Sequence, residues 1–313
     1  MNKRYNDLNT YLRNLFGCRV QKITVDAGLS CPNRDGSLSF GGCIYCNAKG
    51  SGTGAHTHGL SVSEQLIRGK EALSRRYKAK KFIAYFQSFS NTYSSLEKLR
   101  SLYDEALAVE DVAGLSIGTR PDCVNEAILQ LLESYAKDRL IWIEYGLQSA
   151  HDATLAFINR GHNLQCFKDA VNATKNRGIN ICVHLILGLP GETKAQMLET
   201  ANIVADMGLD GVKLHLLYVI KGTVLEKLYQ HGDYNCMEQL EYIDIVCDVL
   251  ERLPGEMIIQ RLTGDPHKEE LVAPLWSLRK RETLDLIAHT MEMRNSFQGK
   301  FFLPRMNTND KHK

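Results

Sequence analysis

The sequence predicts an α/β fold, because six short β-rich runs alternate with helix-spaced apolar segments between residues 21 and 219. Several of these runs are almost continuously apolar, as expected for parallel strands that are covered on both faces. No Gly-x-Gly-x-x-Gly pattern follows the first run, which argues against a dinucleotide-binding sheet. Periodicity alone leaves both a barrel and an open doubly wound sheet possible.

The predicted elements follow one another in a regular order. Turn-forming residues bound each β-rich run, and apolar residues recur at helical spacing between the runs. Ser61 and Glu64 form a capping box at the start of the second helix, and Gly208 ends the last helix of the series. The strands are expected at 21–25, 81–87, 114–119, 140–148, 179–188 and 211–219, and the helices at 5–16, 61–76, 96–107, 124–132, 164–177 and 193–207.

The pattern becomes mostly helical after residue 225, with one further strand expected at 256–262 and a final helix at 283–293. No linker rich in proline, glycine or serine divides the chain. We therefore expect a single domain over residues 1–298, with a core at about 20–260 and a flexible tail at 299–313.

Composition limits the class of protein. The 313 residues carry a net charge of +2, so there is no global attraction to nucleic acid or to an anionic membrane. Nine cysteines, an odd number in a long chain, argue against a disulfide framework. The chain shows neither a signal peptide nor an apolar run long enough to span a bilayer. These features predict a cytoplasmic protein without a membrane partner.

The loop after the first predicted strand contains Cys31, Cys43 and Cys46. Proline, asparagine, aspartate and glycine residues between the cysteines exclude a regular helix or strand. Thiolates suit zinc or an iron–sulfur cluster rather than magnesium or calcium. The carboxyl end of a parallel strand is also where active sites collect. The sequence therefore predicts a soft-metal site, and three thiolates leave one coordination position open.

Two other interpretations of these thiols remain. Either His56 or His58 is close enough in sequence to complete a closed zinc site of the Cys3His type. Zinc sites mostly use two short cysteine pairs, whereas only Cys43 and Cys46 form such a pair. Buried unreactive cysteines are the third interpretation, which the turn-rich loop disfavours. The glycine-rich segment 50–58 is expected to be a flexible extension, because it lacks the lysine and helix of a phosphate-binding loop.

At this point the sequence resembles the radical S-adenosylmethionine (radical SAM) superfamily, through the run Gly42-Cys43-Ile44-Tyr45-Cys46. The commonest radical SAM pattern has three residues between the first two cysteines, whereas this chain has eleven. That long gap is similar to the radical SAM portion of the Elongator catalytic subunit, and most of all to small bacterial Elongator-like proteins without its acetyltransferase half. Further matching stretches occur in the same order at 119–122, 144–149, 160–162, 188–191 and 221–223.

The resemblance implies a partial (β/α)6 barrel with a mostly helical C-terminal extension. It also implies a radical SAM enzyme whose [4Fe–4S] cluster is held by Cys31, Cys43 and Cys46. S-adenosylmethionine (SAM) would chelate the fourth iron, and one electron would cleave it to methionine and a 5′-deoxyadenosyl radical.

Contacts to the adenine of SAM follow from the same resemblance. Tyr45 would pack on the adenine, although an aromatic residue there suits the core equally well. The stretch containing Leu187, Gly188 and Gly191 would line the adenine, because glycine permits close approach of the backbone.

Other candidates would contact the polar parts of SAM. Gln87 and Ser88 stand where the superfamily binds the amino group, although the usual Gly-Gly-Glu is missing. Gln148 and Ser149 would reach the ribose hydroxyls. Arg160 would pair with the carboxylate, and the alternative is an ordinary surface arginine.

Catalytic candidates are fewer. Cys123 follows the third strand and is expected to face the site. His184 and His215 alternate with apolar residues on their strands, so they are either hydrogen-bonded core residues or contacts to substrate, and the core interpretation is favoured. The remaining cysteines of the later chain are expected to be small buried apolar residues, namely Cys166, Cys182, Cys236 and Cys247.

The sequence does not specify the substrate. The resemblance makes modification of a wobble uridine in tRNA the first hypothesis, with a small molecule or a peptide as the alternative. A zinc-stabilised binding protein without catalysis is the hypothesis from a different class. An electron donor such as flavodoxin or ferredoxin is the implied protein partner. The oligomeric state is not predicted.

Overall fold

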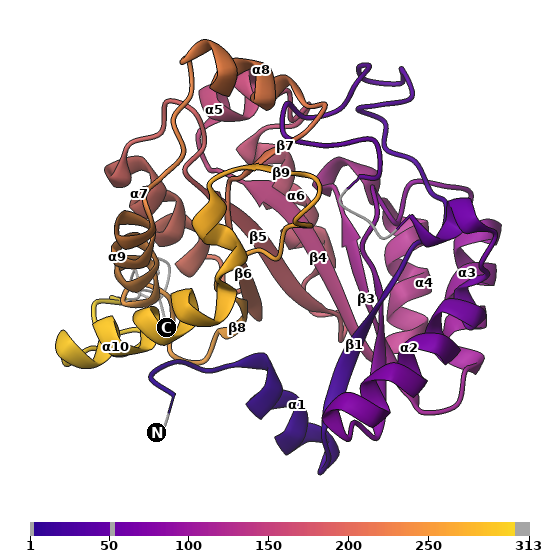
Figure 1. Cartoon of the computed structure of the whole chain (residues 1–313). Coiled ribbons are helices and arrows are strands. Elements are labelled where there is room, and N and C mark those ends of the chain that lie inside the picture. The colour runs from indigo at the N-terminus through magenta and orange to yellow at the C-terminus, as the bar shows by residue number, and fades with distance from the viewer. Residues whose placement is uncertain (1–2, 51–53, 304–313) are drawn as a thin grey trace, which may run out of the picture.

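The computed structural model describes residues 3–50 and 54–303. Within them, one parallel sheet of seven strands curves into an open half-barrel with helices on its outer face (Figure 1). All six predicted strands are present, and the expected strand at 256–262 supplies the seventh. In spatial order they are β1 Val20–Val25, β2 Lys81–Phe86, β3 Val112–Thr119, β4 Leu140–Gln148, β5 Asn180–Leu187, β6 Gly211–Leu216 and β8 Ile258–Arg261.

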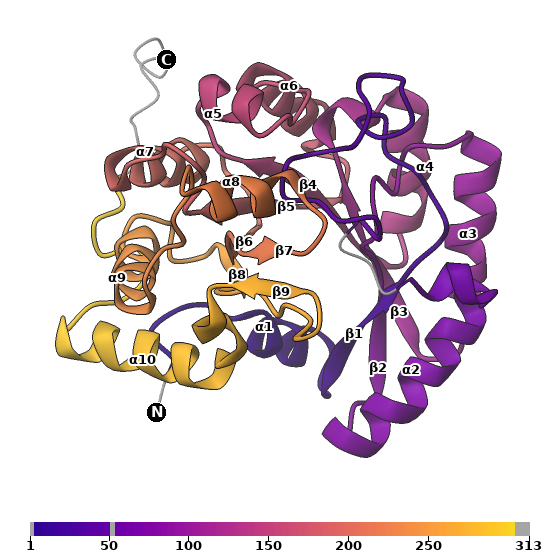
Figure 2. The ribbon, with the colours of Figure 1, turned by 45° about the horizontal axis from the view of Figure 1, so that its top comes forward.

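Helices follow the strands around the outside of the sheet (Figure 2). The predicted capping box is confirmed, because the side chains of Ser61 and Glu64 bond each other's backbone N–H groups. The first helix begins later than predicted, because the Asp7 carboxylate caps its N-terminus. The helices are α1 Leu8–Phe16, α2 Val62–Tyr77, α3 Leu96–Ala108, α4 Glu126–Ala136, α5 Asp152–Phe157, α6 Leu164–Thr174, α7 Lys194–Ala205, α8 Val224–His231, α9 Gln239–Leu250 and α10 Lys280–Met293.

The strand predicted at 211–219 is two elements. β6 ends at Leu216, and β7, Val219–Ile220, pairs antiparallel with β9, Leu271–Ala273, in a small ribbon. Because the ribbon follows β6 directly, it brings residues near 218 and 270 together at the carboxyl end of the sheet.

Alternation along the strands gives the sheet two different faces. Outward side chains such as Val25, Phe86 and Ile117 are buried beneath the helices in the main core. Inward positions instead carry several polar residues, among them Glu144 and Lys213. The inside of the half-barrel is therefore a polar chamber within an apolar shell.

Helix α1 closes the amino-terminal end of this chamber. Tyr11 packs edge-on against Trp142 of β4, with ring centroids 6.0 Å apart. Trp142, Cys182 and Ile258 form a small apolar cluster with side chains of α1. The chamber is therefore accessible from the carboxyl ends of the strands.

Two segments expected to be flexible are partly described. Ala55–His58 forms a short 3-10 helix, whereas residues 51–53 lie outside the described part of the chain. The backbone N–H groups of Gly299 and Phe301 bond the carbonyls of Leu250 and Glu251 at the end of α9, so the predicted tail begins attached to the fold. Residues 304–313 lie outside the described residues. None of the helices described is long and apolar enough to cross a membrane.

Candidate active site

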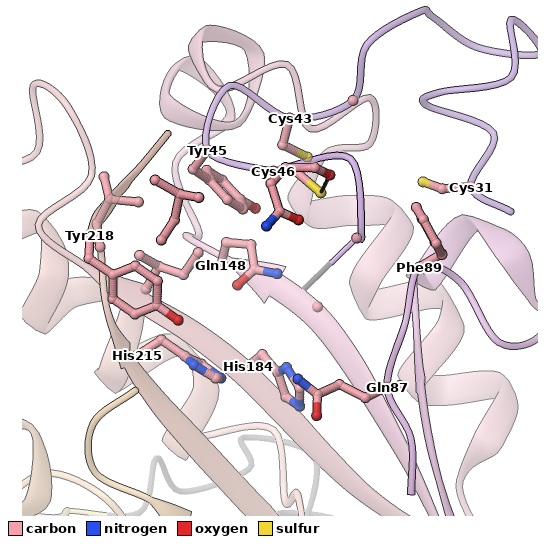
Figure 3. A pocket seen from close by; sticks show the side chains of 18 of the residues that line it. Cys31, Cys43, Tyr45, Cys46, Gln87, Phe89, Gln148, His184, His215 and Tyr218 are labelled. Carbon is pink, nitrogen blue, oxygen red and sulfur yellow. Dashed lines mark hydrogen bonds between the residues drawn. The ribbon is translucent and has the colours of Figure 1, made fainter. Parts of the chain in front are cut away.

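A cavity of about 570 Å³ opens at the carboxyl ends of the parallel strands (Figure 3). Its volume lies in the range of pockets that enclose small organic ligands. The walls come from strands β1 to β6, from the end of β8, from the cysteine loop and from the segment near residue 267. This is the edge of a parallel α/β sheet where active sites form.

Cys31, Cys43 and Cys46 all line this cavity as free thiols. The Cys46 N–H bonds the Cys43 carbonyl at 2.9 Å, so a tight turn holds these two residues together. Figure 3 shows Cys31 apart from this pair, near Phe89. Among the described residues, no three histidine, cysteine or acidic side chains are grouped closely enough to hold a single metal ion.

Two arginines direct their guanidinium groups at the thiol sulfurs. Arg34 Nη1 lies 3.3 Å from Cys46 Sγ, and Arg160 Nη1 lies 3.7 Å from Cys43 Sγ. Burial raises the pKa of Cys46 to about 11, and the nearby Cys43 adds to this, whereas Arg34 opposes it. Cationic donors at both sulfurs favour the thiolate form that a soft metal requires.

Arg160 is buried, so the alternative of an ordinary surface arginine is wrong. Its Nε and Nη2 donate to the Gly146 carbonyl at 3.1 and 2.6 Å. A Cβ at position 146 would lie 2.6 Å from Nη2, so glycine is needed there. Three nitrogens of Arg160 are thus directed at the protein itself, which differs from the predicted bidentate pair with a carboxylate.

Two of the motifs noted in the sequence hold each other in place. Arg120 Nη1 donates to the Arg160 carbonyl at 2.7 Å. Its Nε and Nη2 bond the two oxygens of Asp122 at 2.8 and 2.7 Å. Asn33 of the cysteine loop also donates to the Asn159 carbonyl at 2.5 Å. These bonds connect the cysteine loop, the end of β3 and the segment after α5.

Several predicted SAM contacts line the cavity, namely Tyr45, Gln87, Gln148 and Arg160. Gln148 has φ +81 next to an irregularity in the pairing of β4 and β5, which changes the direction of the strand. Burial raises the pKa of Tyr45 well above its usual range, and the nearby Cys43 contributes, so its phenol is protonated.

Other candidates are not among the residues that line this cavity. The Ser149 hydroxyl donates to Glu192, and Ser88 is buried behind the end of β2. Leu187 is part of the main core, because outward positions of β5 face the helices. Gly188 and Gly191 line a separate cavity of about 410 Å³.

Cys123 is likewise not among the residues lining the larger cavity. It is 8% exposed, and burial followed by the negative charge of Asp122 raises its pKa to about 12. A thiol with so high a pKa is protonated at neutral pH and is a poor nucleophile.

His184 and His215 both line the cavity, and within the described residues only His184 has the hydrogen bond that the favoured core interpretation expects. His184 Nε2 bonds Glu144 at 2.7 Å. His215 Nε2 is buried and has no hydrogen-bond partner among the residues described. Burial is the largest cause that lowers the pKa of both rings, to about 4 for His184, where the hydrogen bond to Glu144 opposes it; both rings are therefore neutral at pH 7.

A buried charged network forms the floor of the cavity around Glu144. Its carboxylate accepts from Lys22 and His184 at 2.7 Å each, and also from Lys213 and Ser116. Burial raises the pKa of Glu144, but its cationic partners lower it by more, so the net pKa lies well below the usual range. The pKa of Lys213 is lowered to about 7, because burial outweighs the attraction of Glu144.

Sequence reasoning missed Glu144, Lys213 and Arg261 as residues of this site. The signal was present, since charged residues at alternate positions of nearly apolar strands are either paired or functional. The local sequence around these residues shows neither which residues they pair with nor that they face a cavity.

A curved parallel sheet with three free thiols at its carboxyl end defines the class of protein. Residues 35–204 match the sequence model of the Radical SAM superfamily, and residues 209–293 match that of the Radical_SAM C-terminal domain. The chain belongs to the radical SAM superfamily, and is therefore an enzyme that uses a [4Fe–4S] cluster and SAM.

Three individual proteins are similar to this chain in sequence or in fold. The uncharacterized protein YtqA of Bacillus subtilis is 43% identical over 96% of this chain and 93% of its own length. The tRNA uridine(34) acetyltransferase of Methanocaldococcus jannaschii is 29% identical over 55% of this chain but only 31% of its own length. The solved Elp3 of Methanocaldococcus infernus shares the fold, with a TM-score of 0.67 at 17% identity, over 89% of this chain and 64% of that chain.

The residues present fit the cofactors of this superfamily. Soft thiolate ligands line a cavity that also carries buried polar atoms without a partner in the described chain, such as His215 Nε2. A single tetrahedral zinc ion needs sulfurs roughly 3.8 Å apart, from Zn–S bonds of about 2.3 Å. A cluster takes each cysteine at a different iron atom, so the three sulfurs need not meet at one metal ion.

Proposed function

We propose that Cys31, Cys43 and Cys46 hold the [4Fe–4S] cluster and that the enzyme cleaves SAM reductively. The observation that carries this proposal is that all three thiols of one loop line a single cavity at the carboxyl ends of the strands. When bound, the reduced cluster supplies one electron to the sulfonium of SAM, which gives methionine and a 5′-deoxyadenosyl radical for abstracting hydrogen from substrate.

The protein contributes position and charge. Arg34 and Arg160 donate to the sulfurs of Cys46 and Cys43, and such outer contacts fix ligands and tune a metal centre. Tyr45 packs against the apolar cluster that contains Ile186 and Leu217. These three side chains also line the cavity, and they offer SAM an apolar wall on the side of the cysteine loop.

For the substrate, the proposal is a uridine at the wobble position of tRNA. It is supported by the relative whose printed name is tRNA uridine(34) acetyltransferase, with which the chain aligns over 55% of its length. A cytoplasmic one-electron donor such as flavodoxin or ferredoxin would reduce the cluster. A small molecule or a peptide is the alternative substrate class.

Anaerobic reconstitution tests whether the three cysteines hold the cluster and whether the enzyme cleaves SAM. The full chain is loaded with iron and sulfide, and 5′-deoxyadenosine formed from SAM under dithionite is measured. Alanine variants of Cys31, Cys43 and Cys46 should lose the cluster absorbance and the product. Cys18→Ala is the matched control, because Cys18 lies at the α1 end of the sheet. A colourless wild-type protein with stoichiometric zinc would contradict the proposal.

The proposal that the substrate is a tRNA uridine needs a separate measurement. Modified nucleosides in total tRNA are compared by mass spectrometry between cells with and without the gene. Loss of one modified wobble uridine supports this substrate. An unchanged nucleoside profile would remove tRNA and leave the small-molecule or peptide alternative.

A further inference from the structure

Arg261 places a cation without a protein partner at the floor of the cavity. It ends β8 and stands in register with Lys213 of β6. Its side chain lines the cavity and makes no hydrogen bond or ion pair with any residue in the described ranges. The other arginines there are engaged, Arg34 with the Asn47 carbonyl, Arg120 with Asp122, and Arg160 with the Gly146 carbonyl.

Two neutral polar groups lie beside this cation. His215 Nε2 is buried without a partner in the part of the chain described, and its ring centroid is 5.2 Å from that of His184. Figure 3 shows the Tyr218 hydroxyl directed toward the neighbouring His215 on the same side of the cavity. A Cβ at Gly264 would lie 2.6 Å from the Tyr218 ring, so the absence of a side chain there lets the ring occupy this position.

The protonation of these groups suits an acceptor ligand. Burial raises the pKa of Tyr218, so the phenol keeps its proton and can donate it. Burial first, then Arg261, His184 and Lys213, lower the pKa of His215, so the ring is neutral while the cavity holds no anion. An anion beside the ring would favour its protonation and add a second cationic donor.

Nearby carboxylates do not neutralise Arg261. Glu144 is bonded to two lysines, as described above. Glu270 pairs with Lys49 at 2.5 Å, and Asp265 pairs with Lys280 at 2.9 Å. The positive charge at the end of β8 is therefore available to a ligand.

We propose that Arg261, His215 and Tyr218 bind an oxyanion of the substrate, a phosphate or a carboxylate group. A forked guanidinium with two neutral donors matches the several acceptor atoms of such a group. This inference rests on the proposed function, because it assigns the substrate end of the same cavity. Figure 3 shows His215 and Tyr218 on the opposite side of the cavity from Cys31.

Calorimetry with two simple anions tests the site. Inorganic phosphate and acetate are titrated separately, at low ionic strength, into the reconstituted full chain that is saturated with SAM in the absence of reductant. Because the protein is already saturated with SAM, the subsite that binds the SAM carboxylate is occupied, and the added anions cannot bind there. The variants are Arg261→Gln and Arg261→Lys, with Arg281→Gln as the control, since Arg281 has a 96% exposed side chain.

We expect the wild type to bind at least one anion, and Arg261→Gln to bind it about 10–100-fold more weakly, the range expected for losing a charge-assisted hydrogen bond. Arg261→Lys should recover part of the affinity, and Arg281→Gln should match the wild type. Preference for phosphate would indicate a phosphate-bearing substrate, and preference for acetate a carboxylate.

Two results would overturn the inference. They are no saturable binding of either anion to the SAM-saturated wild type, and equal binding by Arg261→Gln. Neither of these readings requires cleavage of SAM. A protein that binds phosphate through Arg261 but cleaves no SAM refutes the proposed function alone, whereas a SAM-cleaving protein that binds neither anion refutes this inference alone.

Discussion

Arg34 and Arg160 each approach one thiol sulfur, which gives each arginine an electrostatic effect on the cluster that the thiols are proposed to hold. The distances are 3.3 Å to Cys46 and 3.7 Å to Cys43. Hydrogen bonds and positive charge at cluster sulfurs stabilise the reduced, more negative state and so raise the reduction potential.

Arg34→Gln should therefore lower the midpoint potential of the reconstituted cluster. The variant removes a charge and weakens one N–H···S contact while keeping Cys46 itself. An anaerobic redox titration followed by electron paramagnetic resonance measures the potential, with Arg281→Gln as the control. An unchanged or higher potential would contradict the predicted effect.

His184 gives a prediction about pH, because its mostly buried ring is neutral beside Glu144. Its pKa of about 4 in the fold lies below the usual value of 6.5. The unfolded chain therefore binds more protons between these values, so stability is fully present above pH 6.5 and is lost as the pH falls toward 4. The contribution is up to about 3 kcal/mol.

The measurement is urea unfolding of the metal-free chain, with a reductant, at steps between pH 6.5 and 5. His184→Gln should show a shallower loss of the free energy of unfolding over this interval than the wild type. Equal slopes for the two proteins would mean that other groups cause the loss.

At the scale of elements, the close pairing of β3 with β4 depends on a glycine. A Cβ on Gly114 would lie 2.0 Å from the Leu140 carbonyl oxygen, which belongs to the backbone and cannot move aside alone. These strands are in the middle of the sheet. A shift at Gly114 would therefore also displace their carboxyl ends, where Thr119 and Gln148 line the cavity.

Gly114→Ala should reduce the free energy of unfolding by about 1–3 kcal/mol through overpacking. Gly255→Ala is the control, because its nearest neighbour would lie 3.8 Å away and its φ is not positive. Chemical denaturation of both variants measures the difference. Similar destabilisation of the two would show that the strands separate easily at this point.

Elements with a strong local pattern are the ones that the sequence predicts well. The apolar runs of β4 and β5 and the capping box at Ser61 need no distant partner to be recognised. The ribbon of β7 and β9 was missed, because Val219–Ile220 is too short for any periodicity. The conformation of Gln148 was missed because its positive φ depends on the pairing of β4 with β5.

At the scale of the whole molecule, Glu144 connects strands that are far apart in sequence. Its partners Lys22, Ser116, His184 and Lys213 come from β1, β3, β5 and β6. Lys22 also donates to Gln260 of β8 at 2.6 Å. One buried carboxylate thus holds together the inner face of the half-barrel.

Glu144→Gln should cost about 3–5 kcal/mol of stability, because it leaves the buried Lys213 and the mostly buried Lys22 without a counter-charge. Glu133→Gln is the control. Glu133 pairs with Arg177 at the surface, and such a pair contributes at most about 1 kcal/mol. Denaturation midpoints measure both changes. Equal small effects would mean that water reaches the floor of the cavity.

The spatial neighbours of the site residues could not be predicted from the sequence, because they depend on the shape of the whole sheet. The three thiols, the two histidines and Arg160 are visible as candidate residues, since their types are chemically distinctive. That Arg160 faces Cys43 and Gly146, or that Arg261 stands beside His215, depends on the curvature and register of the sheet. Both arise from contacts between residues far apart in the sequence, up to the 238 positions that separate Lys22 from Gln260, which no local pattern contains.

The order of the strands also has a consequence for synthesis of the protein. The cysteine loop ends at Cys46, whereas the last strand of the cavity, β8, ends at Arg261. At about 5–20 residues per second, translation reaches Arg261 roughly 10–40 s after Cys46. The thiols are therefore made long before the chamber that encloses them. We expect cluster assembly to follow release of the completed chain, so a ribosome-stalled fragment lacking β8 should acquire no stable cluster.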